Sequence, residues 1–382
     1  MINASTNVRR ARETAGYTLV ELLVSMGIMS LVMAATMTTV SNAVKANDTV
    51  LQMSGMNNSL RVAMDIITRD LLQVGSGLPK SHLISVPNGG PATPFRIPGP
   101  PGSTFTSVAG DPDVNAVIPG PGLGPTINGQ ATDTISVLTA DTSLVSVPLT
   151  AATATTVTLA AVDQQCRAVN ITTGPDRVVA GQLIWLDKGG VNTLVQITAV
   201  NATTRVLTFA AGDSLNLNQT AAGVTGGNLN VLNGSAPTGT SPLACPGNPQ
   251  VLSTLATRVR MISYYLDTTV ANHPRLVRRI NNGHPTSFNN TLGTSVATDI
   301  EGLSFTYDLA DGPTMVRFTQ PDLSGGGGGA CGGPCSVNMI RKINVSLTGR
   351  SANAAATKTK AYRNTLTSQI SLRGMSFFNV YQ

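Results

Sequence analysis

The pattern of hydrophobic and polar residues begins with one long apolar run. Between Tyr17 and Val40 the only charged residue is Glu21, and most of the other residues are apolar or small. A helix needs about 20 mainly apolar residues to cross the hydrocarbon core of a bilayer, so residues 17–40 can form a transmembrane helix. The polar leader ahead of the run carries Arg9, Arg10 and Arg12. Positive charge beside a span favours the cytoplasm, which predicts a single-pass inner-membrane protein with a cytoplasmic N-terminus.

Beyond Val40, apolar residues recur at steps of three and four, the spacing of an amphipathic helix. The stripe consists of Met53, Met56, Leu60, Met64, Ile67, Leu71 and Val74. Polar residues, Asp70 among them, are expected on the other faces of the helix. Gly75 to Pro79 end the pattern. We therefore predict one helix from Tyr17 to Val74, whose second half lies beneath a globular head. A coiled-coil dimer is the alternative explanation of the stripe.

The rest of the chain shows turns and short alternating segments. Residues 77–132 are rich in Pro-Gly and Gly-Pro pairs without a period, which predicts an irregular loop region. From Asp133 onward, apolar and polar residues alternate in short segments, the pattern of antiparallel strands with one buried face. We predict an α+β fold, in which the long helix (17–76) packs on a C-terminal antiparallel β-sheet domain (251–382). Residues 133–250 are predicted to form an inserted all-β domain.

Composition and charge point to the same class of protein. Charged residues make up 12% and aromatic residues 4% of the chain, which is typical of a turn-rich, extracytoplasmic β protein. The excess of positive charge lies in residues 251–382, which carry 13 Lys and Arg against 6 Asp and Glu. Residues 81–250 carry 5 Lys and Arg against 8 Asp and Glu. The acidic middle segment is therefore a candidate complement for basic neighbouring subunits.

The position of Gly16 argues against an ordinary signal sequence. A secretory signal peptide has a shorter apolar core and is cut after it, whereas Gly16 stands before the core. An uncut signal anchor would leave the carboxylate of Glu21 in lipid, at a cost of roughly 2.5–3.5 kcal/mol. A cut between Gly16 and Tyr17 leaves the apolar segment on the mature chain. It also creates an α-amino group, on the same or a neighbouring chain, that can pair with Glu21.

These residues carry a resemblance to a known family. Gly16-Tyr17-Thr18-Leu19-Val20-Glu21, with a basic leader before it and an apolar helix after it, resembles the leader of type IV prepilins and of type II secretion pseudopilins. The resemblance implies that a prepilin peptidase removes residues 1–16, cutting after Gly16, and methylates the new N-terminus at Tyr17. It also implies that Glu21 sets the register of subunits during assembly. The chain departs from the usual pattern in having Tyr at position 17 where Phe is common, and in having no proline before Pro79.

The order of the C-terminal segments extends the resemblance to residues 251–382. A Tyr-Tyr strand, a Leu-Val-Arg-Arg strand, Ile-Glu-Gly-Leu-Ser-Phe-Thr-Tyr and Lys-Ile-Asn-Val-Ser-Leu look like a PilW-type minor pilin. The J-type pseudopilin of type II secretion has the same architecture. Residues 81–250 are longer than expected for the J-type pseudopilins, which favours the pilus class.

The four cysteines fit an oxidising compartment and disulfide bonds. Cys331 and Cys335 could close a small loop, and Cys166 and Cys245 would then pair across the middle domain, although four cysteines allow three connectivities. A zinc site is the alternative, but the histidines lie far from every cysteine in sequence: His82, His273 and His284. We expect no metal and no cofactor.

A basic and aromatic cluster suggests a second kind of function. Arginines stand close in sequence to Tyr264 in the segments that begin residues 251–382, and such combinations can bind single-stranded nucleic acid. The candidate residues are Arg258, Arg260, Arg278, Arg279 and Tyr264. Arginines on strands are more often solvated or paired with neighbouring subunits, so DNA is the weaker hypothesis. No arrangement of catalytic residues stands out, and we expect no enzyme activity.

The sequence thus predicts a minor pilin subunit of a type IV pilus that acts in filament initiation or at the tip after leader cleavage and N-methylation. Its expected partners are other pilins, through the N-terminal helix, and the prepilin peptidase. The C-terminal part is expected to be periplasmic, or outside the cell in an assembled filament. One alternative is a type II secretion pseudopilin, and another is a pilin-anchored adhesin or DNA-binding module.

Overall fold

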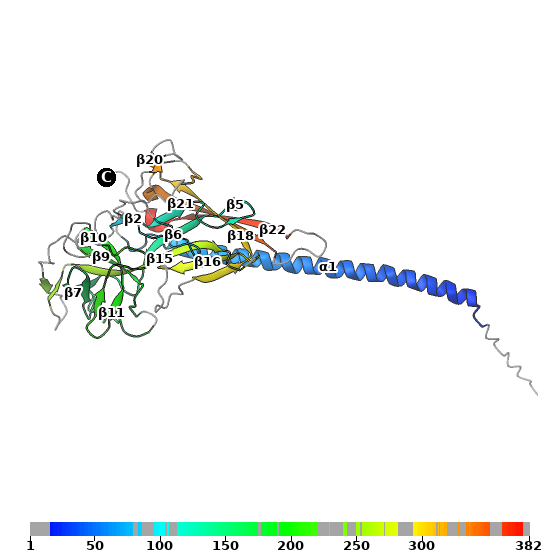
Figure 1. Ribbon diagram of the computed structural model, residues 1–382, viewed down its shortest axis with the longest axis horizontal. Coiled ribbons are helices and arrows are strands. Elements are labelled where there is room, and N and C mark those ends of the chain that lie inside the picture. Colours follow the sequence, from blue (N-terminus) through cyan, green and yellow to red (C-terminus); the bar gives the residue numbers. More distant parts are fainter. Residues whose placement is uncertain are drawn as a thin grey trace, which may run out of the picture.

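A long helix projects from a β-rich head in the computed structural model (Figure 1). The structure describes residues 16–78, 83–85, 95–103, 105–106, 113–174, 177–188, 191–219, 229, 240–242, 250–252, 254–270, 272–281, 293–310, 312, 314–318, 327–328, 334–335, 337–351 and 361–376. Helix α1 (Leu19–Leu72) has 54 residues and is therefore about 80 Å long. Its first part projects from the head, and its last part lies within it (Figure 1).

The larger sheet has eleven strands and surrounds one long strand, β15 (Leu255–Asp267). One side of β15 pairs with β6 (Thr134–Ala140) and β7 (Val147–Ala152). The other side pairs with β9 (Leu183–Lys188) and β16 (Arg275–Ile280). The remaining strands extend the sheet from these: β3 (Val117–Gly120), β8 (Thr156–Leu159), β10 (Val191–Gln196), β11 (Ala199–Asn201), β12 (Val206–Thr208) and β17 (Thr294–Thr298).

A second sheet has three antiparallel strands in the order β18 (Ile300–Leu309), β21 (Ile340–Arg350) and β22 (Arg363–Ser371). The short 3-10 helix η2 (Val337–Met339) leads into β21, and the short helix α2 (Arg373–Ser376) follows β22. Four two-stranded antiparallel sheets complete the described strands. They are β1 (Leu83–Ser85) with β2 (Asp113–Asn115), β4 (Thr126–Ile127) with β5 (Gln130–Ala131), β13 (Thr240–Pro242) with β14 (Gln250–Leu252), and β19 (Gly327–Gly328) with β20 (Pro334–Cys335).

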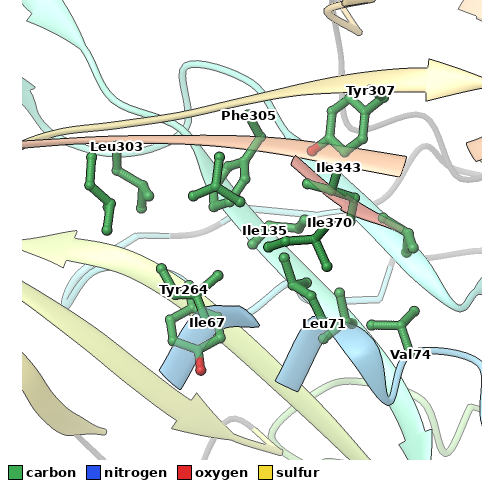
Figure 2. Packing of buried hydrophobic residues seen from close by; sticks show 14 of the residues in the cluster. Ile67, Leu71, Val74, Ile135, Tyr264, Leu303, Phe305, Tyr307, Ile343 and Ile370 are labelled. Carbon is green, nitrogen blue, oxygen red and sulfur yellow. The ribbon is translucent and has the colours of Figure 1, made fainter. Parts of the chain in front are cut away.

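The main core lies where the last third of α1 meets both sheets. Ile67 and Leu71 of the helix are buried together with Tyr264 of β15, Phe305 of β18 and Ile370 of β22 (Figure 2). Fully burying an aliphatic side chain of this size contributes about 1.5–3 kcal/mol. The helix therefore joins the two sheets into one head.

Two further hydrophobic clusters lie within the larger sheet. One gathers β7, β8, β9, β10 and β12 around Leu186 and Leu207. The other includes Leu138, Leu183 and Met261, with Trp185 packed against it. The head therefore contains two further cores, in which residues 133–219 pack with other segments and α1 takes no part.

The predicted helix and stripe agree with the structure except in detail. Helix α1 ends at Leu72 instead of Val74, although Val74 is still buried. Met53 was expected in the buried stripe but is 38% exposed, so the buried face begins at Met56. Asp70 was expected on a solvent-facing side, yet it is buried. The long helix and the antiparallel sheets together are consistent with the predicted α+β class.

The sheets do not follow the predicted division of the chain. Residues 77–132 contain β1 to β5, and β3 pairs with β6, because Val117 and Ile118 belong to buried clusters that the turn-rich sequence around them obscures. Strand β15 lies on the C-terminal side of the expected boundary at residue 250 but pairs with β6, β7 and β9 on the other side. The larger sheet therefore continues across that boundary.

Candidate functional site

The N-terminal end of α1 exposes the predicted processing site. Residues 16–18 precede the helix, and Thr18 has the extended conformation of a helix cap, with φ −74° and ψ 151°. Tyr17 is 87% exposed, and a Cβ placed on Gly16 would meet no atom within 4 Å. The bond between Gly16 and Tyr17 is thus in exposed backbone outside the hydrogen-bonded helix, where a peptidase can bind it in an extended form.

Thr18 and Glu21 cap the helix reciprocally. The backbone amide of Glu21 donates to the hydroxyl of Thr18 at 3.2 Å, and the backbone amide of Thr18 donates to Oε2 of Glu21 at 3.2 Å. The Thr18 hydroxyl lies 3.3 Å from the same carboxylate oxygen. This capping box satisfies two amides that a helix start otherwise leaves unpaired. It also holds the carboxylate of Glu21 one residue away from the α-amino group that cleavage would create at Tyr17.

The surface of α1 that follows is uncovered, and it is apolar from Leu22 to Val40. No residue from 19 to 55 is buried by the rest of the chain, and an 18-residue window of this helix has a mean hydropathy of 2.0. The hydroxyl groups of the serines and threonines in residues 22–40 are satisfied within the helix. Ser25 donates to the carbonyl of Leu22, and Thr38 donates to the carbonyl of Ala34, at 2.9 and 2.7 Å. A segment whose polar groups bond internally suits a lipid environment. The helix therefore fits single-pass membrane anchoring.

The prokaryotic N-terminal methylation motif matches residues 12–37. The match includes the exposed Gly16–Tyr17 bond, the capping box and the first part of the apolar surface. No curated protein and no solved structure matches the chain at a significant level. The motif indicates a type IV pilin-like or pseudopilin-like protein, which implies processing by a prepilin peptidase and assembly with other pilins.

The arginines proposed to bind nucleic acid are engaged within the head. Arg258 has a side chain only 3% exposed and lies 2.8 Å from the carboxylate of Asp141. Arg260 is about half exposed and pairs with the same carboxylate at 2.6 Å. Burial raises the pKa of Asp141, but Arg258 and hydrogen bonds from Ser143 outweigh it, so that the net pKa is lowered. Burial lowers the pKa of Arg279, and the neighbouring Tyr265 offsets part of this effect.

Tyr264 and Arg278 meet at Asp70 of α1. The Tyr264 hydroxyl donates to Oδ2 of Asp70 at 2.5 Å, and Nε of Arg278 donates to the same oxygen at 2.5 Å. Tyr264 is completely buried, and burial raises its pKa, as does the neighbouring carboxylate of Asp70. Its ring is therefore not available for stacking on a base. Four of the five candidates thus belong to two internal networks, around Asp141 and around Asp70, and the fifth, Arg279, lies beside Tyr265.

Asp70 is the contact that the sequence analysis missed. It links α1 to β15 and β16, and so fixes the helix to the larger sheet. The signal was present in the spacing, because Asp70 lies three residues after Ile67 and one before Leu71, both of which are on the buried face. A charged residue within a buried stripe predicts a buried partner of opposite charge.

A second buried carboxylate ties the smaller sheet together. Glu301 on β18 binds Arg350 of β21 at 3.1 Å and Arg363 of β22 at 2.6 Å. Burial raises the pKa of Glu301, but Arg363, Asn128 and Arg350 lower it by more, so that the net pKa lies below its usual range. All three strands of this sheet are thereby joined through one side chain.

The remaining predicted sites concern cysteines and metals. Cys166 is disulfide-bonded. Cys245 and Cys331, and the side chain of Cys335, lie outside the described residues, so the pairings stay predictions. His82 and His284 also lie outside them, and His273 pairs with Asp299 at 2.8 Å. Within the described part of the chain, no three His, Cys, Asp or Glu side chains are grouped as metal ligands would be.

Proposed function

We propose that this chain is a minor pilin of a type IV pilus that contributes to filament initiation or to the filament tip. The observation that carries the proposal is the uncovered apolar surface of residues 19–40, which begins at an exposed predicted cleavage site and a capped Glu21. Such a surface needs a membrane before assembly and neighbouring helices after it. The proposal assigns no catalytic reaction and no cofactor to the chain.

The size of the head favours a minor subunit over the main one. A head built from residues 56–382 has a radius of gyration of about 20 Å, whereas packed helices lie about 8–10 Å apart. A filament made entirely of such subunits would have to separate their heads widely along its axis. One copy at the end of the filament, or a few copies in it, meets no such constraint.

Copy number and deletion test the proposal. In the organism that encodes the chain, deletion should abolish or strongly reduce surface filaments, and the wild-type gene should restore them. Quantitative mass spectrometry of sheared filaments should find this chain at no more than a few per cent of the main subunit. Ile28→Val, which keeps the apolar surface, is the matched control and should complement fully. A chain as abundant as the main subunit, or normal piliation after its deletion, would contradict the proposal.

A type II secretion pseudopilin is the second candidate, because the methylation motif does not distinguish the two classes. In that case deletion leaves surface filaments intact and traps secreted enzymes in the periplasm. The DNA-binding alternative is weaker, since Tyr264 and Arg258 are buried. It predicts that the solubilised chain binds single-stranded DNA with an affinity that falls steeply as salt rises.

A further inference from the structure

The three-stranded sheet has two edges, and the β18 edge is closed. The outward carbonyl of Leu303 accepts from the amide of Asp133 at 2.8 Å, and the outward amide of Phe305 donates to the Asp133 carboxylate at 2.9 Å. Tyr307 exchanges two backbone hydrogen bonds with Val316, each of 2.8 Å. The register with β21 also shifts near both ends of β18. These are the devices by which proteins protect sheet edges.

Within the described part of the chain, no such backbone bonds close the outer edge of β22. The carbonyl of Tyr362 and the amide of Leu372 both bond toward β21, at Ser351 and Arg341. Backbone direction alternates along an antiparallel strand, so the even-numbered residues between them face β21 and the odd-numbered ones face outward. The amide of Thr365 is bonded to the side chain of Asn364. Among the described residues, the outward backbone groups of Thr367, Gln369 and Ser371 have no partner.

β22 is also suited to pairing in other respects. It has nine residues in an uninterrupted register with β21, where a typical strand has about five or six. It contains no proline and no lysine. The outward-facing residues Thr365, Thr367, Gln369 and Ser371 are exposed. A long, regular edge without a blocking residue is a template for strand addition.

The edge lies next to the surface that assembles. β22 packs beside α1 (Figure 1), and the side chain of Asn364 donates to that of Asn57 on the helix at 2.8 Å. Asn57 lies two residues after the uncovered part of α1, which ends at Gly55. A subunit that packs along residues 19–55 therefore brings its own head toward the start of β22.

We propose that the outer edge of β22 accepts a β-strand from the head of a different pilin-like subunit. This inference rests on the proposed function, in which a chain of low copy number has other subunits as neighbours. A second copy cannot add its own β22 to this edge in the antiparallel sense. Two β22 edges paired antiparallel are related by a twofold axis normal to the sheet, which reverses every direction in its plane. Because α1 runs along that sheet, the two helices would point in opposite directions and could not share one membrane orientation.

A proline at Thr367 tests the edge without breaking the sheet. The Thr367 amide faces outward, so Thr367→Pro removes no bond to β21 and blocks an added strand. Thr367→Val keeps the amide and is the matched control. Both full-length variants are expressed in the deletion strain. We expect the Thr367→Val variant to enter the filament fraction as the wild type does. The amount of the Thr367→Pro variant in that fraction should be at least tenfold lower. The melting temperature, read from Trp185 fluorescence, shows whether the proline variant is folded.

If the proline variant unfolds, two other measurements test whether β22 accepts a strand: hydrogen exchange of the wild-type chain and photo-crosslinking. Hydrogen exchange at Thr367, Gln369 and Ser371 should be fast in the detergent-extracted chain and at least tenfold slower in the filament fraction. Ser368 and Ile370, which face β21, should be protected in both. A photo-crosslinker at Gln369 should capture a strand of another protein that carries the methylation motif.

The possible failures are distinguishable. If the wild-type chain never enters a filament fraction, the proposed function fails and the docking edge fails with it. If the chain enters filaments but the outward amides exchange equally fast in both states, only the edge is wrong. A crosslink to this same chain, or normal incorporation of folded Thr367→Pro, would also overturn the edge.

Discussion

The first two thirds and the last third of α1 belong to one continuous helix but have opposite surroundings. Residues 19–55 are nowhere buried by the chain, whereas residues 56–72 place a stripe of side chains in the main core. In the first part, residues 22–40 are apolar or small on nearly all faces and residues 41–55 carry polar and charged side chains, whereas the second part is apolar only toward the sheets. A helix that is apolar all round needs an apolar environment that this chain does not supply. One part therefore stabilises the head, and the other is available for membrane and subunits.

The sharpest test of this contrast exchanges the same residue type in the two parts. Ile67→Ala removes a completely buried side chain and should destabilise the head by about 2–5 kcal/mol. Ile28→Ala lies on the uncovered surface and should leave head stability unchanged. Denaturant unfolding of the full chain in detergent, followed by the single tryptophan Trp185, measures both. Equal effects of the two substitutions would show that the contrast is wrong.

The buried carboxylate in the second part gives the next largest effect. Asp70→Asn removes the charge that Arg278 and Tyr264 share, and should cost about 1–3 kcal/mol because those groups lose their partner. Asp65→Asn, on an exposed face of the same helix, should change stability by less than about 0.5 kcal/mol. The same unfolding experiment compares them. A destabilised Asp65 variant beside an unaffected Asp70 variant would contradict the assigned faces.

The head should lose stability in acid through Glu301 and Asp141. Both have pKa values lowered in the folded protein, so their contribution is present above the unfolded values of about 4.3 and 3.9. It is lost as the pH falls through the lower folded values. Asp213 acts in the opposite sense, because burial raises its pKa. Melting temperatures from pH 7 to pH 2 should therefore fall less steeply for Glu301→Gln than for the wild type. An unchanged slope would remove Glu301 from this account.

The smallest effect is expected at the start of the helix. Thr18→Val removes the hydroxyl of the capping box and should weaken the first turn by about 1 kcal/mol. Hydrogen exchange at Glu21 should become faster, while the melting temperature of the head stays the same. Thr39→Val, in the interior of the same surface, is the control and should not alter exchange at Glu21. Unchanged exchange in Thr18→Val would show that the capping box does not form in solution.

The accuracy of prediction followed the range of the interactions. The helix and its buried face were predictable because the spacing from Met56 to Leu71 repeats locally. Pairings between distant segments, such as β15 with β6 and β9, depend on contacts that no local pattern contains. The methylation motif at residues 12–37 was identifiable because its signal lies within consecutive residues. The partners of Arg258 and Tyr264 were not, since Asp141 and Asp70 are distant in sequence.

The most direct test of the central claim is the intact mass and N-terminal sequence of the chain extracted from membranes. We predict that it begins at N-methylated Tyr17. The Gly16→Val variant should retain the leader. Because a Cβ at this position meets no atom within 4 Å, the loss of cleavage would reflect peptidase recognition instead of strain. A chain that begins at Met1, or that is cut after Ala35 or later, would contradict the account, because the apolar surface of α1 would then serve only as a plain anchor or be lost.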